Sequence, residues 1–391
     1  MNMNRMVMAC RYLLLLIILC MTTSCWDRRE MDDLALIMGS GIDLTDTGLV
    51  EVSYQIALPT GIPSAVSSGG GKKQVVIISA KGNDIQEALG RVQQQMSRSI
   101  YFGHREVFLI GENYARQGLN QLQDLFTRFP ETRYNSFVLT AYGTTAKEIL
   151  SASYPMELIP ALAISKIQSS RQSFSVKFDK FLEAFSSPGT SPVTAAIRII
   201  HKGTDRESVA IDRAAVYLDN HLSGFIPPEE LELLRWWIGD PYRLGFTIQA
   251  EPEDKEYKGT ISVKSSESSV HVRTKIIDDQ PEAEVTFHAV VKVVSNNTRL
   301  NLIDDKIRKT VEQQFSNKLK LRIEGLLKLV QKEMKSDIFG LGEEIHIEHP
   351  AFWKRTKNSW SENFPEMTVN IKVDFQIEQL GKTQGRTYLK Q

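Results

Sequence analysis

The sequence predicts a multi-domain α+β protein, with mixed and antiparallel sheets and packed helices, behind an N-terminal targeting segment. Two observations on the patterning predict this class, and a third, on the cysteines, limits the chemistry of the body. Short strand patterns alternate with helical patterns over roughly the first half of the chain. Strand patterns of period 2 dominate after about Asp205. All three cysteines lie at or before Cys25, so the rest of the chain has no thiol for a disulfide or a thiolate zinc site.

The first part of the chain predicts strands joined by helices. Strand patterns cover 34–42, 50–58, 75–79, 106–110 and 136–142. Helical patterns cover 84–96 and 118–129, and apolar residues share one face in each. Between the second and third strands, residues 59–73 are rich in Gly, Ser and Pro, which predicts a long exposed loop.

The middle of the chain predicts helices. They are expected through most of 144–186, where Thr145 and Glu148 form a capping box and Leu158 belongs to an apolar stripe. Strand character returns at 195–200.

The last part of the chain is rich in strands. Asp219-Asn220 predicts a two-residue hairpin turn between strands over 214–218 and 221–225. Helices are expected over 229–238 and over 304–335, where Gly325 is a candidate break. Further strands are expected over 259–264, 270–277, 284–294, 345–348 and 367–377. The last of these alternates most regularly, which predicts one buried face and one wet face.

The N-terminus predicts a secretory signal peptide. Arg5 and Arg11 precede an apolar run over 12–21, and small polar residues follow. Spanning a bilayer as a helix takes about 20 apolar residues, so a permanent transmembrane anchor is the weaker interpretation.

The segment Thr22-Thr23-Ser24-Cys25 is similar to the box that ends bacterial lipoprotein signal peptides. In such proteins the cysteine thiol receives a diacylglycerol, and the amine that cleavage frees is often acylated. The family pattern favours Leu at the position that Thr22 holds. Cleavage with an incidental Cys25 is the alternative. We expect Cys25 to be the lipid attachment site.

Residues 25–35 and 39–43, just after the box, resemble the start of the mature C subunit of the spore-germination nutrient receptors, a lipoprotein family. Other segments are similar to family motifs in order and approximate spacing. They are Ser97–His104, Arg213–Tyr217 with Leu222-Ser223-Gly224, Asp337–Gly342, Pro350–Trp353 and Trp360–Pro365.

The resemblance implies a body of three α+β domains with boundaries near residues 143 and 206. The expected division is a signal peptide over 1–24, an N-terminal α/β domain over 25–142, a small mostly helical middle domain over 143–205 and a C-terminal α+β domain over 206–391.

The resemblance also implies a function. The chain would be a lipid-anchored, non-enzymatic subunit on the outer surface of the inner spore membrane, beside an A subunit with soluble and membrane parts and an integral B subunit. It would act by assembly and signalling, and no cofactor, metal or catalytic residue is implied. A solute-binding lipoprotein that captures the nutrient itself is the alternative. A lipoprotein hydrolase acting on spore cortex is a third.

Composition and isolated motifs give little support to other chemistry. The chain has 47 Lys+Arg and 47 Asp+Glu, which excludes nucleic-acid binding as the default. The glycines and lysines over 69–73 lack the spacing of a phosphate-binding loop, and Gly381-Lys382-Thr383 predicts a terminal turn. His346 and His349 are two possible zinc ligands, but zinc needs a third or fourth, so a structural or solvated pair is favoured.

Two further features have a plain and a functional interpretation. Residues 305–335 carry nine Lys+Arg against four acids, which is typical of a solvated helix face and less often of a surface that rests on anionic headgroups. Four tryptophans are expected in the core rather than as ligand platforms; these are Trp236, Trp237, Trp353 and Trp360.

Overall fold

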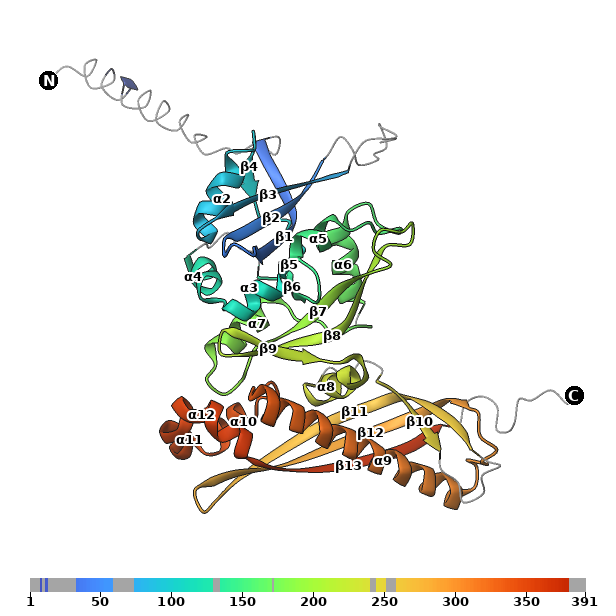
Figure 1. Ribbon diagram of the computed structural model, residues 1–391. Helices are drawn as coiled ribbons and strands as arrows, with labels where there is room; N and C mark the ends of the chain where they lie inside the picture. The colour runs from blue at the N-terminus through green and yellow to red at the C-terminus, as the bar shows by residue number, and fades with distance from the viewer. Residues whose placement is uncertain are drawn as a thin grey trace, which may run out of the picture.

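The computed structural model describes residues 33–58, 74–128, 134–170, 172–239, 244–250 and 258–379, with the single positions 8, 11 and 12. Two bodies lie one above the other (Figure 1). We call the described residues of 33–226 the N-terminal body and those of 228–379 the C-terminal body. Cys25, the predicted loop over 59–73 and the predicted turn at Gly381 lie outside the described residues.

One mixed sheet forms the centre of the N-terminal body. Its strands are β1 Leu34–Leu44, β2 Val50–Ala57, β3 Val75–Gly82, β4 Ser99–Tyr101, β5 Val107–Ile110, β6 Phe137–Ala141, β7 Val193–Ile200, β8 Ser208–Leu218 and β9 His221–Ile226. In the described part of the chain the order is β3-β2-β1-β5-β6-β7-β8-β9, with β4 also paired to β1. In the middle of the sheet, the neighbours along β1-β5-β6-β7 pair in parallel. Toward the two edges, the neighbours along β3-β2-β1 and along β7-β8-β9 pair antiparallel.

Short helices cover this sheet. They are α2 Ile85–Gln93, α3 Glu112–Gln117, α4 Asn120–Arg128, α5 Ala146–Ser151, α6 Pro160–Ser169 and α7 Phe178–Ser186. Helix α2 buries Ile85, Ala88 and Val92 and packs on β2 and β3. The capping box of Thr145 and Glu148 begins α5, as predicted. Apolar spacing and caps therefore place these helices, apart from α3, where the sequence predicts them.

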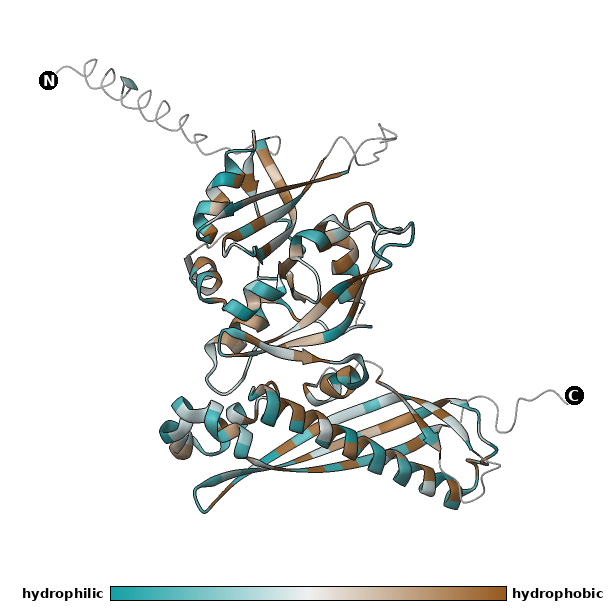
Figure 2. Cartoon of the chain, viewed as in Figure 1, coloured by the Kyte–Doolittle hydropathy of each residue, from teal (hydrophilic) through white to brown (hydrophobic). Residues whose placement is uncertain are grey.

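A second sheet forms the C-terminal body. Its strands are β10 Gly245–Ala250, β11 Gly259–Ile277, β12 Gln280–Asn296 and β13 Thr368–Gln379, in that order. The first three pair antiparallel, and β13 pairs in parallel with β12. Along β13 the residues Ile371, Phe375 and Ile377 are buried while their neighbours are not. The alternation of apolar and polar residues is visible along these strands (Figure 2), and it confirms the predicted one-sided final strand.

Helices connect and cover the second sheet. They are α8 Leu231–Trp237, α9 Asp305–Lys328, α10 Leu341–Glu348, α11 Pro350–Thr356 and α12 Trp360–Asn363. Helix α9 runs along the sheet (Figure 1), where the ring of Phe315 stacks on that of Phe375 with centroids 4.7 Å apart. A π-helical turn over Leu329–Met334 continues α9 and ends at Lys335, whose backbone is left-handed with φ 54°. None of the helices in the described ranges is long and apolar enough to cross a membrane.

One apolar core links the two bodies through α8. It contains buried residues of the first sheet, such as Leu139, and of the second, such as Phe287. The ring of Trp236 lies 5.1 Å from that of Phe287, and the ring of Trp237 stacks on Phe339 with centroids 3.8 Å apart. A second cluster lies wholly within the N-terminal body. The bodies therefore share a core and do not meet only through surface contacts.

The α+β class with mixed and antiparallel sheets is confirmed, and four local predictions are wrong. Residues 345–348 belong to helix α10 and do not form a strand. Gly325 lies inside α9 and does not break it, because one glycine in a helix costs only about 1 kcal/mol. The two strands predicted over 259–277 are one strand, β11. Leu158 is exposed and lies outside any helical stripe.

The division of the body at residues 143 and 206 stays a prediction. The first sheet runs without interruption through strands on both sides of each position, from β6 through β7 to β8. Strand β10 and helix α3, which the sequence analysis did not predict, complete the fold.

Candidate interdomain site

The segment 187–192, between α7 and β7, contacts the C-terminal body at Asp337–Gly342, one of the segments that the sequence analysis singled out. The backbone N–H of Ser191 donates to the carbonyl of Asp337 over 2.7 Å. Gly189 lies directly against Gly342, because a Cβ on either glycine would come within 2.8 Å of the other's backbone. Glycine at both positions is therefore what permits the two bodies to approach this closely.

Asp337 is the polar centre of this contact. Its Oδ1 accepts hydrogen bonds from the backbone N–H groups of Phe339 and Leu341, at 3.2 and 3.1 Å. Its Oδ2 accepts from the N–H of Gly342 at 2.7 Å and from the indole Nε1 of Trp360 at 3.0 Å. The carboxylate lies at the start of α10, where it satisfies N–H groups that have no partner in the helix.

Burial raises the pKa of Asp337 from 3.8 to about 6, and the hydrogen bonds from Gly342 and Trp360 act in the opposite direction. The side chain is 2% exposed. At neutral pH the group is therefore an ionised carboxylate, and each of its oxygens accepts two hydrogen bonds. Such a group stabilises one arrangement of its donors, because losing any of them leaves a buried charge with fewer partners.

The aromatic motifs gather around this carboxylate. The rings of Trp353 and Trp360 meet edge to face with centroids 5.5 Å apart, and Phe364 lies 6.2 Å beyond Trp360. Trp353 and Trp360 are both 3% exposed. Together with buried Trp236 and Trp237, they confirm that the tryptophans belong to the core. Three segments that the sequence analysis singled out separately therefore form one cluster.

Two hollows open to solvent flank the contact. One, of about 650 Å³, is lined by residues of both bodies, including Asp219, Lys335, Lys357 and Trp360. The other, of about 510 Å³, is lined by Glu343, Trp353, Lys354, Lys357 and their neighbours. They share Ser187, Pro188 and Lys357, and we call them together the junction groove.

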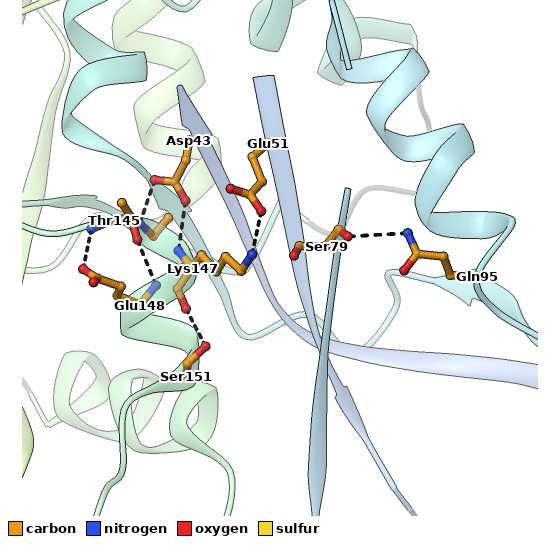
Figure 3. Close-up of polar contacts among 9 residues, drawn as sticks. Asp43, Glu51, Ser79, Gln95, Thr145, Lys147, Glu148 and Ser151 are labelled. Carbon is orange, nitrogen blue, oxygen red and sulfur yellow. Dashed lines mark hydrogen bonds and ion pairs between the residues drawn. The ribbon is translucent and has the colours of Figure 1, made fainter. Parts of the chain in front are cut away.

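A second buried carboxylate, Asp43, lies in the N-terminal body (Figure 3). It accepts hydrogen bonds from the N–H groups of Ala146 at 2.8 Å and Lys147 at 3.0 Å, at the start of α5. Burial raises its pKa to about 6. The amine of Lys147 pairs with Glu51 on β2, 2.6 Å away. Asp43 and Asp337 thus use the same device, a buried carboxylate at a helix start, to fix a helix on its body.

The motif over 97–104 is followed directly by a buried cation, the guanidinium of Arg105. The guanidinium of Arg105 lies 5.7 Å from the ring centroid of Phe102, 5.3 Å from that of Phe108 and 5.7 Å from that of Phe178. Burial lowers the pKa of Arg105 to about 10. The arrangement is a cation–π cluster that ties this motif to α7.

The remaining sequence candidates do not assemble into a site. His346 and His349 lie at the end of helix α10, where His346 stacks on Trp353 with centroids 5.8 Å apart. Among the described residues no three His, Cys, Asp or Glu side chains are grouped as metal ligands would be. The exposed lysines of α9, such as Lys306 and Lys309, face solvent. The lipid attachment predicted at Cys25 lies outside the described residues and stays a prediction.

Sequence reasoning did not single out the carboxylate of Asp337 or the lysines of the junction groove. A signal for the former existed, since Asp337 precedes Gly340-Leu341-Gly342 at a spacing suited to cap a helix. No local signal marks Lys335 or Lys357, because the groove forms only when the two bodies meet.

Comparison with known proteins gives matches along nearly the whole chain. Residues 27–199 match a family model described as "Spore germination protein N-terminal domain", and residues 212–381 match one described as "Spore germination B3/GerAC like, C-terminal". "Spore germination protein KC" of Bacillus subtilis (strain 168) is 25% identical, over 94% of this chain and 95% of the relative. "Spore germination protein B3" of the same organism is 25% identical, over 91% and 94%.

A solved structure is also similar. The crystal structure of the GerBC protein superimposes with a TM-score of 0.54 at 22% sequence identity, over 87% of this chain and 96% of that one. This likeness supports the fold described above.

Proposed function

Because this chain belongs to the C-subunit family of the spore germinant receptors, we propose that it is a lipid-anchored subunit required for germination in response to nutrients. It acts by assembly and signalling with the integral membrane A and B subunits of the same receptor. It is held at the outer surface of the inner spore membrane by lipid on Cys25, and it catalyses no reaction.

The observation that carries this proposal is the extent of the match. Both family models lie on the chain in order and together reach from residue 27 to residue 381, so the chain carries both of the units that they describe. The segments that resemble family motifs near residues 337–364 are used to pack two bodies together and not to line an enclosed reaction site. A body built to hold a fixed surface suits a subunit that works through partners.

The proposal is tested in spores that lack this chain. They are expected to lose the response to one set of nutrients and to germinate normally with a non-nutrient trigger, because the downstream machinery is intact. Restoring the wild-type chain should restore the response. Germination unchanged toward every nutrient that the parent strain senses would contradict the proposal.

Direct capture of the nutrient is the second candidate, and the 650 Å³ hollow between the bodies is the observation that favours it. Calorimetry on the purified protein distinguishes direct nutrient capture from a role through partner subunits. We expect no binding of amino acids, sugars or nucleosides, whereas a Kd near 1 μM, about −8 kcal/mol, would select the solute-binding function.

A further inference from the structure

Four strand ends meet at one end of the N-terminal body, away from the C-terminal body (Figure 1). Strand β1 begins beside β4, because Leu36 pairs in parallel with Tyr101. Strand β2 ends and β3 begins at the same end of the sheet, because β2 pairs antiparallel with both β1 and β3. Asp33, which directly precedes β1, lies here as well.

The predicted lipid attachment site is close to this end of the body in the sequence. Cys25 lies eight positions before Asp33. A fully extended chain spans at most about 3.6 Å per residue, so Cys25 is no more than about 29 Å from Asp33. Lipid on Cys25 that is held in a bilayer therefore keeps the end where β1 begins close to the membrane surface.

The open face of the β1–β4 pair carries apolar side chains that the core does not use. Along β1, Ala35 and Ile37 are buried in the cluster of the N-terminal body. Leu34 and Leu36 point to the opposite face, because neighbours along a strand alternate, and Tyr101 shares that face with its partner Leu36. Within the described part of the chain, these three side chains are half-buried and pack against neither core cluster.

The loop over 152–159, between α5 and α6, exposes two more apolar side chains. Met156 is 79% exposed and Leu158 is 54% exposed. Both ends of the loop are fixed on β2. The side-chain amide of Gln55 donates to the carbonyl of Leu150 over 2.6 Å and accepts from the backbone N–H of Ala161 over 3.0 Å. The loop is therefore held against the sheet.

This loop and the open face of the β1–β4 pair lie on the same side of the sheet. Ile37 and Ile56 are paired, and both are buried on the other side, in the cluster that includes α2. Gln55 and Leu36, which precede them in their strands, therefore both point toward the side of the loop. We use the name apolar shelf for Leu34, Leu36, Tyr101, Met156 and Leu158.

The charged side chains next to the apolar shelf have both signs. Asp33 and Arg98 flank the β1–β4 pair, and Glu157 in the loop pairs with Lys166 at 2.5 Å. Charge therefore does not select an anionic surface over a neutral one. Large apolar side chains exposed near a lipid anchor instead favour the hydrocarbon boundary of a bilayer, and tyrosine is enriched at that depth.

We propose that the apolar shelf rests on the lipid bilayer, with Met156 and Leu158 inserted at the boundary between headgroups and acyl chains. This contact fixes the orientation of the protein and places the C-terminal body on the side away from the membrane. The inference rests on the proposed function, because lipid on Cys25 brings the shelf to the bilayer.

The test uses the lipidated full-length mature chain in vesicles, with a fluorescent label on one introduced cysteine. The chain has no cysteine after Cys25, and lipid blocks that thiol, so only the introduced residue is labelled. Lipids brominated near the headgroup end of their chains are expected to quench a label at Met156→Cys at least about twofold, since an interfacial surface penetrates roughly 5–10 Å. Quenching should be equal in vesicles of phosphatidylcholine alone and in vesicles that also contain phosphatidylglycerol, because the contact is apolar.

Two controls separate insertion from simple exposure. Leu321→Cys places the label on α9, where the leucine is 68% exposed, and should not be quenched. A label at Ser99→Cys, on β4, should be quenched, and the added double substitution Met156→Asp with Leu158→Asp should remove most of that quenching. Leu321→Asp with Ile347→Asp makes the same change at two exposed side chains of the C-terminal body and should leave it unaltered.

Each outcome decides the inference. Equal quenching at Met156 and Leu321, or none at either, in chains that carry lipid overturns it and leaves the proposed function standing. A chain without lipid on Cys25 that stays free of vesicles overturns the inference together with the lipid anchor of the proposed function. A label at Met156 that is shielded from a soluble quencher without vesicles, in a protein that sediments as a dimer, assigns the shelf to a second copy and also overturns the inference.

Discussion

The indole Nε1 of Trp360 donates a 3.0 Å hydrogen bond to Oδ2 of Asp337, and both side chains are buried where the two bodies meet. The same oxygen accepts a hydrogen bond from the backbone N–H of Gly342. Gly342 in turn packs directly against Gly189 of the other body. One carboxylate thus positions a tryptophan, the start of a helix and an interdomain contact.

Asp337→Asn is expected to destabilise the protein by about 2–4 kcal/mol. An amide has one acceptor oxygen, so its NH₂ group would face two N–H donors that the carboxylate now satisfies, and a buried donor without a partner costs about 1–3 kcal/mol. Urea unfolding of the purified protein measures the change in the free energy of unfolding. Asp278→Asn, at an exposed turn residue, is the matched control and should change stability by less than about 0.5 kcal/mol. Equal effects of the two substitutions would contradict the role given to Asp337.

The stability of the protein should depend on pH through two buried carboxylates, one in each body. In the folded state the pKa values of Asp43 and Asp337 are raised from 3.8 to about 6, so between these values the folded state binds more protons than the unfolded state. Their contribution to stability therefore rises as the pH falls from 7 toward 4, by roughly 1 kcal/mol for each group between pH 7 and pH 5.

This dependence is isolated by comparing variants. The stability of the wild type minus that of Asp43→Asn, measured by thermal unfolding, should increase on acidification from pH 7 to pH 5. A difference that stays constant or decreases over this range would show that the carboxylate is not protonated there.

Trp353→Ala is expected to cost about 3–5 kcal/mol, because the ring is 3% exposed and its removal leaves a cavity beside Trp360. Trp353→Phe should cost less. Leu321→Ala, which shortens a side chain that is 68% exposed on α9, serves as the control and should be nearly neutral. Chemical denaturation gives all three values, and a loss below about 1 kcal/mol for Trp353→Ala would show that the site collapses around the gap.

Gly189→Ala should weaken the contact between the bodies. The added Cβ would lie 2.7 Å from the backbone N of Glu343 and 2.8 Å from the carbonyl carbon of Gly342, so backbone must move. Limited proteolysis should then cut faster near residues 187–192. Gly90→Ala, inside α2 with nothing within 4 Å, is the matched control and should stabilise the protein by up to about 1 kcal/mol.

Cys25→Ala is expected to abolish lipid attachment and to leave much less of the protein in the membrane fraction. Each buried CH₂ of an acyl chain contributes about 0.8 kcal/mol to membrane binding, and stable anchoring takes two chains or one chain with a second signal. Labelling with a radioactive fatty acid checks this directly. Uptake of label by the variant at the wild-type level would show that the lipid is attached elsewhere.

Local sequence patterns determined much of the secondary structure by themselves. The regular alternation over 367–377 predicts β13, Thr145 and Glu148 predict the start of α5, and Asp219-Asn220 predicts the turn between β8 and β9. The motifs after Cys25 also indicate the family to which the chain belongs. Each of these signals depends on residues within a few positions of one another, because period and capping are local properties of the backbone.

Only the tertiary structure decided how these elements are used. His346 lies on a helix, although the short apolar pattern around it favoured a strand, because α10 begins on the carboxylate of Asp337 and packs against β11. Lys335 and Lys357 line one hollow together with Asp219 of the other body, and this grouping forms only where the two bodies meet. The partners that fix these features lie far apart in sequence, 153 residues in the case of Gly189 and Gly342. No local pattern encodes which distant surfaces will pack together.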